Sequence, residues 1–183
     1  MSKVQTDNSY LEAKIKLRIE NIPAKDSLKI LDLYGGDGHI WNTIKERTKL
    51  NITLLRIDKK KDKKGIYLKG ENLKFLMNFD LSVYDIIDVD AYGVPYEQLK
   101  YILNNNYKGV IFITYIQSMF GGIPKKMLYE LNYTNDMIKK IPTLFNTDGL
   151  GKLKQWLALY GITKIKRISF EKKHYLAINL GEQ

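Results

Sequence analysis

Hydrophobic positions recur along the chain with two different periods, and this predicts alternating helices and strands. Leu11, Ile15 and Ile19 are spaced four residues apart, which predicts a helix over 10–21 that ends before Pro23. The same spacing predicts helices over 39–47, 72–78, 95–105 and 150–160. Short apolar, β-branched runs predict strands over 28–33, 51–57, 66–68, 84–90, 110–116, 163–170 and 174–180.

Strands that alternate with helices are typical of an α/β sheet that is mostly parallel. The last two predicted strands are joined by the three residues 171–173, so they must form an antiparallel pair at the C-terminal end of the chain. Residues 59–65 are too few for a helical crossover, which needs about 10–12 residues. Either this helix is missing or the third strand lies elsewhere.

The pattern indicates a single domain over residues 1–183. Residues 1–27 form a helical N-terminal extension of this domain. On the first helix, Lys14, Lys16 and Arg18 lie off the apolar stripe and are expected to face solvent rather than a bound phosphate. Residues 117–149 are irregular and contain Pro124 and Pro142, so we expect a substrate-side insertion there.

Composition excludes several kinds of chemistry. The chain has no Cys, so disulfides, Cys-ligated metals and thiol nucleophiles are excluded. The two His residues, His39 and His174, are far apart in the sequence, and we expect no metal site. The first eight residues are mostly polar, and apolar runs such as 110–113 are far shorter than the roughly 20 residues of a membrane span. We therefore expect a soluble, cytoplasmic protein without a membrane partner.

The net charge of +10 favours an anionic partner such as nucleic acid. Only four of the 30 basic residues are Arg, although phosphate-binding surfaces usually use Arg as well as Lys. A Lys-rich, Asn-rich and Ile-rich composition is also what an AT-rich genome encodes. Charge taken by itself therefore leaves both explanations open.

Two predicted strands end in residues that suit a ligand. In 32–38, Asp-Leu-Tyr-Gly-Gly-Asp-Gly, a strand runs through a glycine-rich turn into a helix, and such turns let a ligand approach the backbone. Asp37 in this turn disfavours a phosphate and suits an amine or a sulfonium. Asp58 ends the next strand, where a carboxylate can bind ribose hydroxyls. A plain strand-to-helix turn and a surface Asp beside lysines are the structural alternatives.

A second acidic stretch ends the strand predicted over 84–90. Asp88 and Asp90 are two residues apart and therefore point to the same face. Two carboxylates at the end of a buried strand are costly unless they meet a ligand, a metal or a donor. The alternatives are that Asp88 bonds nearby backbone and that Asp90 caps the following helix.

Taken together, these segments resemble the class I S-adenosylmethionine-dependent methyltransferases. Residues 32–38 are similar to their first motif, Asp58 to their ribose-binding acid and 69–76 to their third motif. Residues 88–95, Asp-Val-Asp-Ala-Tyr-Gly-Val-Pro, are similar to the fourth motif of tRNA guanine-N2 dimethyltransferases, with Ala91 where that family has Pro. The resemblance covers about 28–180 and implies a Rossmann-like sheet with an antiparallel C-terminal strand pair.

The resemblance implies S-adenosyl-L-methionine as the cofactor and assigns roles to particular residues. The cofactor-binding residues would be Asp32, Tyr34, Gly36, Asp37, Gly38, Asp58, Glu71, Asn72 and Asp88. The implied reaction is methylation of an exocyclic amine of a nucleic-acid base, with RNA favoured over DNA. Asp90 and the Ala91 carbonyl would accept the amine hydrogens, and Tyr92 would stack on the base.

Tyr115 and Gln117 lie at the carboxyl end of the strand predicted over 110–116 and are expected to line the substrate pocket. Two other functions remain open. The first is a methyltransferase that acts on a small molecule or a protein. The second is a non-catalytic, methyltransferase-like subunit that helps a partner bind RNA.

Overall fold

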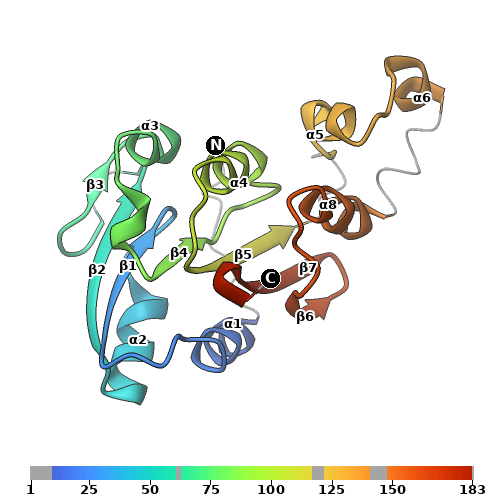
Figure 1. The fold of residues 1–183 in the computed structure, drawn as a ribbon. Coiled ribbons are helices and arrows are strands. Elements are labelled where there is room, and N and C mark those ends of the chain that lie inside the picture. Colours follow the sequence, from blue (N-terminus) through green and yellow to red (C-terminus); the bar gives the residue numbers. More distant parts are fainter. Residues whose placement is uncertain (1–9, 61–62, 117–121, 141–147, 183) are drawn as a thin grey trace.

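The computed structural model describes residues 10–60, 63–116, 122–140 and 148–182. Seven strands form one sheet in the order β3-β2-β1-β4-β5-β7-β6 (Figure 1). Strands β3, β2, β1, β4 and β5 pair in parallel, whereas β7 is antiparallel to both β5 and β6. The strands are β1 (Ser27–Asp32), β2 (Asn51–Asp58), β3 (Leu68–Lys69), β4 (Ile86–Val89), β5 (Val110–Ile116), β6 (Lys166–Phe170) and β7 (Lys173–Asn179).

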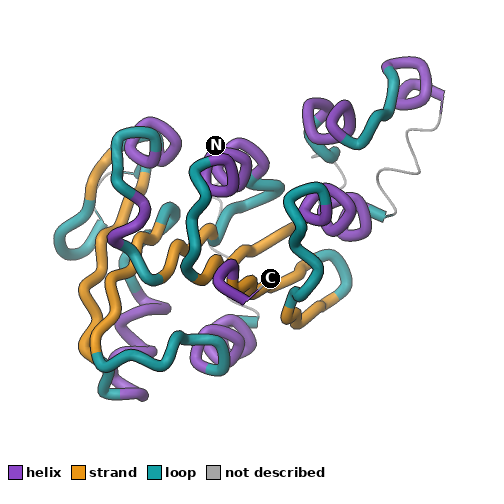
Figure 2. The backbone as a smooth tube through the Cα atoms, viewed as in Figure 1, coloured by secondary structure: helices purple, strands orange, loops and turns teal. Residues whose placement is uncertain are grey.

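Helices cover both faces of this sheet (Figures 1 and 2). One face carries α1 (Leu11–Ile19) and α2 (His39–Thr48), which contact each other. The opposite face carries α3 (Asn72–Leu76), α4 (Tyr96–Asn104) and α8 (Gly149–Ala158). Two short helices, α5 (Lys125–Glu130) and α6 (Asn135–Lys140), lie between β5 and α8 in the chain, and the 3₁₀ turns are Leu81–Val83 and Leu180–Glu182.

The predicted α/β class and the antiparallel C-terminal pair are confirmed by this topology. Most predicted boundaries agree with the structure to within about two residues. The largest difference is at β6, which begins at Lys166 rather than at residue 163. The third strand begins at Leu68, two residues later than predicted, and pairs in parallel with Ile57 and Asp58. The described residues of the β2–β3 connection contain no helix, so the missing-helix alternative is the correct one.

Each face of the sheet has its own core. Ile30, Trp41 and Phe112 belong to the core under α1 and α2, whereas Ile111 and Trp156 belong to the core on the other face. Successive residues of a strand point to opposite faces, so alternate residues of a buried strand enter different cores. This alternation decides which strand-end side chains can meet one another.

In the part of the chain that the structure describes, no helix combines the length and the apolar character that crossing a membrane requires.

Candidate active site

The glycine turn after β1 packs directly against the end of β2. The Gly36 N–H donates to Asp58 Oδ2 at 3.1 Å, and the Gly35 N–H donates to the Ile57 carbonyl at 3.0 Å. Gly36 and Gly38 have φ angles of 47° and 74°, which lie in the left-handed region that favours glycine. The turn therefore places a backbone donor and a carboxylate side by side at the carboxyl edge of the sheet.

Arg56 holds this turn in place and was missed by the sequence analysis. Its buried guanidinium donates to the Gly36 carbonyl at 3.0 Å and to the carbonyls of Lys64 and Ile66 at 2.7 and 3.0 Å. A Cβ on Gly35 would lie 2.7 Å from the Arg56 Cβ, so these residues are in close contact. The sequence feature that could have revealed this role is the position of Arg56, a charged residue that follows two leucines near the end of β2.

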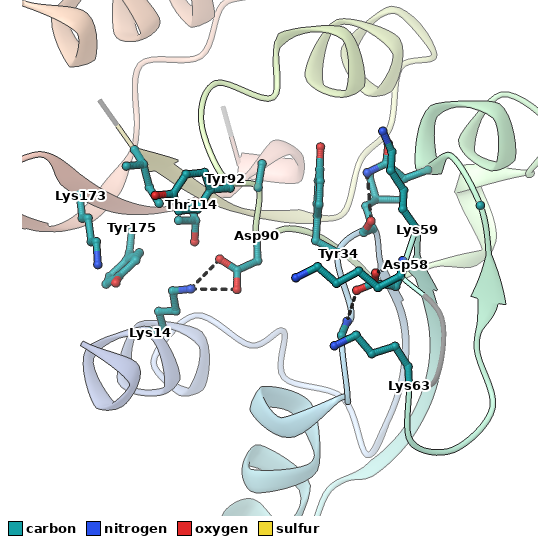
Figure 3. A pocket seen from close by; sticks show the side chains of 17 residues that line it. Lys14, Tyr34, Asp58, Lys59, Lys63, Asp90, Tyr92, Thr114, Lys173 and Tyr175 are labelled. Atoms are coloured by element: carbon teal, nitrogen blue, oxygen red, sulfur yellow. Dashed lines mark hydrogen bonds and ion pairs between the residues drawn. The ribbon is translucent and has the colours of Figure 1, made fainter. Parts of the chain in front are cut away.

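A pocket of about 320 Å³ opens at this edge of the sheet (Figure 3). Tyr34, Gly36, Asp58, Asp90 and Tyr92 all line it. Figure 3 shows Tyr34 and Asp58 on one side of the pocket, with Asp90 and Tyr92 farther along it. The Asp58 carboxylate accepts from Gly36 and, at 2.7 Å, from the Lys60 N–H. A carboxylate has about four lone-pair sites, so Asp58 keeps capacity for further donors from a ligand.

Of the other residues that were predicted to bind the cofactor, some line the pocket and others lie beside it. Asn72 lines the pocket, but its amide donates to the Leu33 carbonyl at 3.1 Å and accepts from Gln98 at 2.9 Å. Glu71 is half exposed and forms an ion pair with Lys59 at 2.7 Å. Gly38 precedes α2.

Asp37 is turned toward the β2–β3 connection. Its carboxylate accepts from the Lys64 N–H at 3.0 Å, and Lys63 lies 3.7 Å away. The backbone hydrogen bond from Lys64 is the main reason why the pKa of Asp37 is lowered. Asp37 and Glu71 are thus engaged with lysines beside the pocket rather than pointing into it.

Asp88, which was predicted to bind the cofactor, does not line the pocket. Arg18 donates from Nε and Nη2 to its two carboxylate oxygens, both at 2.7 Å, and Trp41 Nε1 donates to Oδ2 at 2.8 Å. Arg18 and Asp88 are each only 1% exposed. Donors from α1 and α2, rather than nearby backbone or a ligand, therefore satisfy this carboxylate. The expectation that Arg18 faces solvent is also wrong.

Asp90 shares the face of Asp88, as predicted, but lies at the pocket. Lys14 of α1 donates to both oxygens of Asp90, at 2.7 and 2.9 Å, so Lys14 does not face solvent either. Burial of Asp90 raises its pKa, but the charges of Lys14 and Arg18 outweigh burial and the pKa lies below its ordinary value. Of the three cations assigned to the solvent face of α1, Lys16 is the exposed one.

Ala91 and Tyr92 follow Asp90 along the wall of the pocket. Ala91 is buried, and its N–H donates to the Val89 carbonyl at 2.8 Å. The Tyr92 side chain is 76% exposed, which is unusual for an aromatic ring at a pocket. Figure 3 shows Tyr92 beside Thr114 at the same end as Asp90. This ring is therefore accessible to a planar ligand.

Asp32 ends β1 directly beside Asp88 in the sheet register. It is buried, and its Oδ1 accepts from the Tyr34 N–H at 3.2 Å. Burial, followed by the charges of Asp88 and Asp90, raises the pKa of Asp32 well above its ordinary value. Asp32 thus accepts a hydrogen bond from the start of the glycine turn, and its buried position beside two other carboxyl groups disfavours its ionisation.

Tyr115 does not line the pocket, so this expectation is wrong. It is 1% exposed and lies in the core on the α4 and α8 face, where it stacks on His174. Its neighbours Thr114 and Ile116 line the pocket instead, because they point to the opposite face of β5. Gln117 lies outside the described residues.

Comparison of the sequence with models of protein families gives no match, and comparison with curated proteins gives none either. Solved structures do match. A protein described as a ribosomal RNA methyltransferase from Plasmodium falciparum is 16% identical with a TM-score of 0.56, over 95% of this chain and 96% of that one.

Two further structures match over most of both chains. A SAM-dependent methyltransferase from Archaeoglobus fulgidus is 12% identical with a TM-score of 0.54, over 94% of each chain. A precorrin-6Y C5,15-methyltransferase from Geobacter metallireducens GS-15 is 12% identical with a TM-score of 0.53, over 97% of this chain and 90% of that one. At these identities the likeness establishes the fold, which is that of the class I S-adenosylmethionine-dependent methyltransferases.

Proposed function

We propose that the protein is an S-adenosylmethionine-dependent methyltransferase. The observation that carries this proposal is the contact between the Gly36 N–H and Asp58 Oδ2 at the rim of the pocket. In an open α/β sheet, ligands bind beyond the carboxyl ends of the strands, and an acid that ends the second strand suits ribose hydroxyls. Asp58 stands at this position with acceptor capacity to spare.

The residues present fit this cofactor. Asp58 would accept hydrogen bonds from the two ribose hydroxyls, and the glycine turn would let the ligand lie against backbone. Tyr34 offers an aromatic face on the same wall, and Asp32 lies beneath the turn. When bound, the cofactor supplies a methyl group that is already activated, so the protein contributes positioning and electrostatics.

The acceptor would bind at the opposite end of the pocket, and we propose an exocyclic amine of a nucleic-acid base. The lone pair of such an amine is conjugated into the ring, so the site must orient it. Asp90 would accept one amine hydrogen and the Ala91 carbonyl the other, while the exposed ring of Tyr92 stacks on the base. Reaching this pocket requires an unpaired or extruded base.

The charge around the pocket supports an anionic substrate such as RNA. Among the described residues that line it, the lysines outnumber the acids: Lys14, Lys59, Lys60, Lys63 and Lys173 against Asp58 and Asp90. Lysines near the mouth of a pocket attract phosphates and accelerate encounter. RNA is favoured over DNA, in agreement with the motif resemblance to tRNA enzymes.

Cofactor binding is tested by calorimetry with S-adenosylmethionine. Asp58→Ala removes two hydrogen bonds to a charged group, each worth about 1.5–3 kcal/mol, so we expect affinity to fall at least a hundredfold. Glu46→Ala is the matched control, because it removes the same charge from an exposed position of α2. Absence of binding by the wild type, or undiminished binding by Asp58→Ala, contradicts the proposal.

The acceptor is tested by transfer of tritiated methyl groups to total RNA, DNA and protein, with identification of the product nucleoside. We expect RNA to be labelled and Asp90→Ala to lose this activity. Full activity of Asp90→Ala would contradict the catalytic assignment. The match to a precorrin methyltransferase makes small molecules a second candidate class, and label found only in a small-molecule fraction would replace nucleic acid as the substrate.

A further inference from the structure

Lys14 brings a positive charge into the candidate active site from outside the segment that carries the methyltransferase-like motifs. Its ammonium donates to Asp90 Oδ1 at 2.7 Å and to Oδ2 at 2.9 Å (Figure 3). The two side chains are 14% and 17% exposed, so water screens this ion pair only weakly. The Tyr175 ring lies under the ammonium, with its centroid 5.4 Å away.

The position of Lys14 is fixed by the fold and not by chance contact at a surface. Lys14 and Arg18 are one helical turn apart, which is about 6 Å along α1. Their partners Asp90 and Asp88 are two residues apart, which is about 6.6 Å along an extended chain. The buried Arg18–Asp88 pair thus locks α1 in the register that places Lys14 at Asp90. Arg18 also donates to the Lys14 carbonyl at 3.1 Å.

Burial and neighbouring carboxyl groups disfavour the ionised form of Asp90, and Lys14 counteracts both. The charged and polar groups that face Asp90 are Lys14 and Arg18 from α1, Asp32 from β1, Asp88 from β4 and Thr114 from β5, while Lys173 and Tyr175 of β7 line the same pocket. Three carboxyl groups therefore share two cations of α1. Burial of Asp90 favours its neutral form, and Lys14 supplies the largest opposing charge.

We infer that Lys14 is a positioning residue of the active site, which keeps Asp90 ionised and holds its oxygens toward the acceptor. An ionised carboxylate accepts a hydrogen bond from an amine, whereas a protonated one offers a donor at one oxygen. Lys14 uses one lone-pair site on each oxygen, so the carboxylate keeps acceptor capacity for the substrate. The inference rests on the proposed function for its consequence in catalysis, but the ionisation of Asp90 is measurable without activity.

The direct test follows the aspartate carboxyl carbons by ¹³C NMR as pH is varied, with Asp90→Asn used to assign the Asp90 signal. In the wild type, we expect Asp90 to titrate below the ordinary value of about 3.9. In Lys14→Met its midpoint should rise by at least one pH unit, and Lys14→Arg should keep it low. Lys16→Met is the matched control, because Lys16 is exposed on the same helix. An unchanged Asp90 titration in Lys14→Met overturns the inference.

A second test measures methyl transfer as a function of pH. The acidic limb of the kcat/KM profile should move to higher pH in Lys14→Met by the same amount as the NMR midpoint, and activity should recover as pH rises. A purely structural role would lower the rate equally at every pH, which would contradict the inference. If Lys14→Met is unstable, Lys14→Gln replaces it in both experiments, because Gln keeps a hydrogen-bond donor but removes the charge. Failure of the wild type to bind S-adenosylmethionine would refute the proposed function and leave the NMR result to stand.

Discussion

The ion pair between Arg18 and Asp88 predicts a large loss of stability when either partner is removed. Both side chains are 1% exposed, and Asp88 accepts two bonds from Arg18 and one from Trp41, at 2.7, 2.7 and 2.8 Å. In Asp88→Asn the guanidinium stays buried without its counter-charge. In Arg18→Met the Asp88 carboxylate stays buried beside Asp32 and Asp90 with Trp41 as its donor.

The expected magnitude follows from this burial. Breaking a buried ion pair by removing one partner costs about 3–5 kcal/mol, a large part of the roughly 5–15 kcal/mol that stabilises a typical domain. For a chain of this length, each kcal/mol corresponds to about 2–4 °C in Tm, so we expect Tm to fall by about 6–20 °C. Urea unfolding followed by circular dichroism measures the loss without relying on the fluorescence of Trp41.

A double-mutant cycle separates the pair from its surroundings. Replacing both partners with apolar residues, as in Arg18→Met with Asp88→Leu, should recover much of the stability, because neither charge is then left buried. Arg47→Met is the control, since Arg47 pairs with Glu12 at an exposed site and its loss should barely move the urea midpoint. A loss in Asp88→Asn no larger than in this control would refute the reasoning.

Three further predictions concern stability. Gly35→Ala places a Cβ 2.7 Å from that of Arg56, so we expect a loss of about 1–3 kcal/mol in urea unfolding. Asp32→Asn should raise Tm at pH 7. Because the pKa of Asp32 is raised in the folded state, its ionisation destabilises the native state above about pH 3.9, and Asn removes this penalty. The increase in Tm should therefore vanish below that pH. Glu130→Gln weakens the acceptor of Trp156 Nε1, now at 2.5 Å, so the urea midpoint should fall and the Trp156 fluorescence should shift.

The sequence predicted the fold well because hydrophobic period is a local signal. The strand predicted over 110–116 matches β5 at both ends, since its run of apolar residues is buried on both faces. The bounds of the third strand were less accurate, because β3 has two residues and is specified by pairing with Ile57 and Asp58 rather than by its own composition. Strand pairing of this kind is a long-range property.

The site was predicted less completely, for two physical reasons. The glycine turn and Asp58 could be found because turn chemistry and strand ends are local features. Asp88 is held away from the pocket by Arg18, which lies 70 residues earlier in the chain, and no local sequence pattern indicates such a partner. Tyr115 was misassigned because both faces of β5 are buried, so alternation does not tell which face meets the pocket.

The cations of α1 also change how the net charge should be understood. Arg18 and Lys14 are internal counter-ions of Asp88 and Asp90, so these two pairs carry no net charge and the whole excess of basic residues lies elsewhere in the chain. We then expect ligand specificity at this edge of the sheet to depend on exposed lysines of the β2–β3 connection that line the pocket, such as Lys60. Because charge screening by salt is strong for exposed lysines and weak for the buried pairs, raising ionic strength should weaken the nucleic-acid binding that we propose while leaving Asp90 ionised.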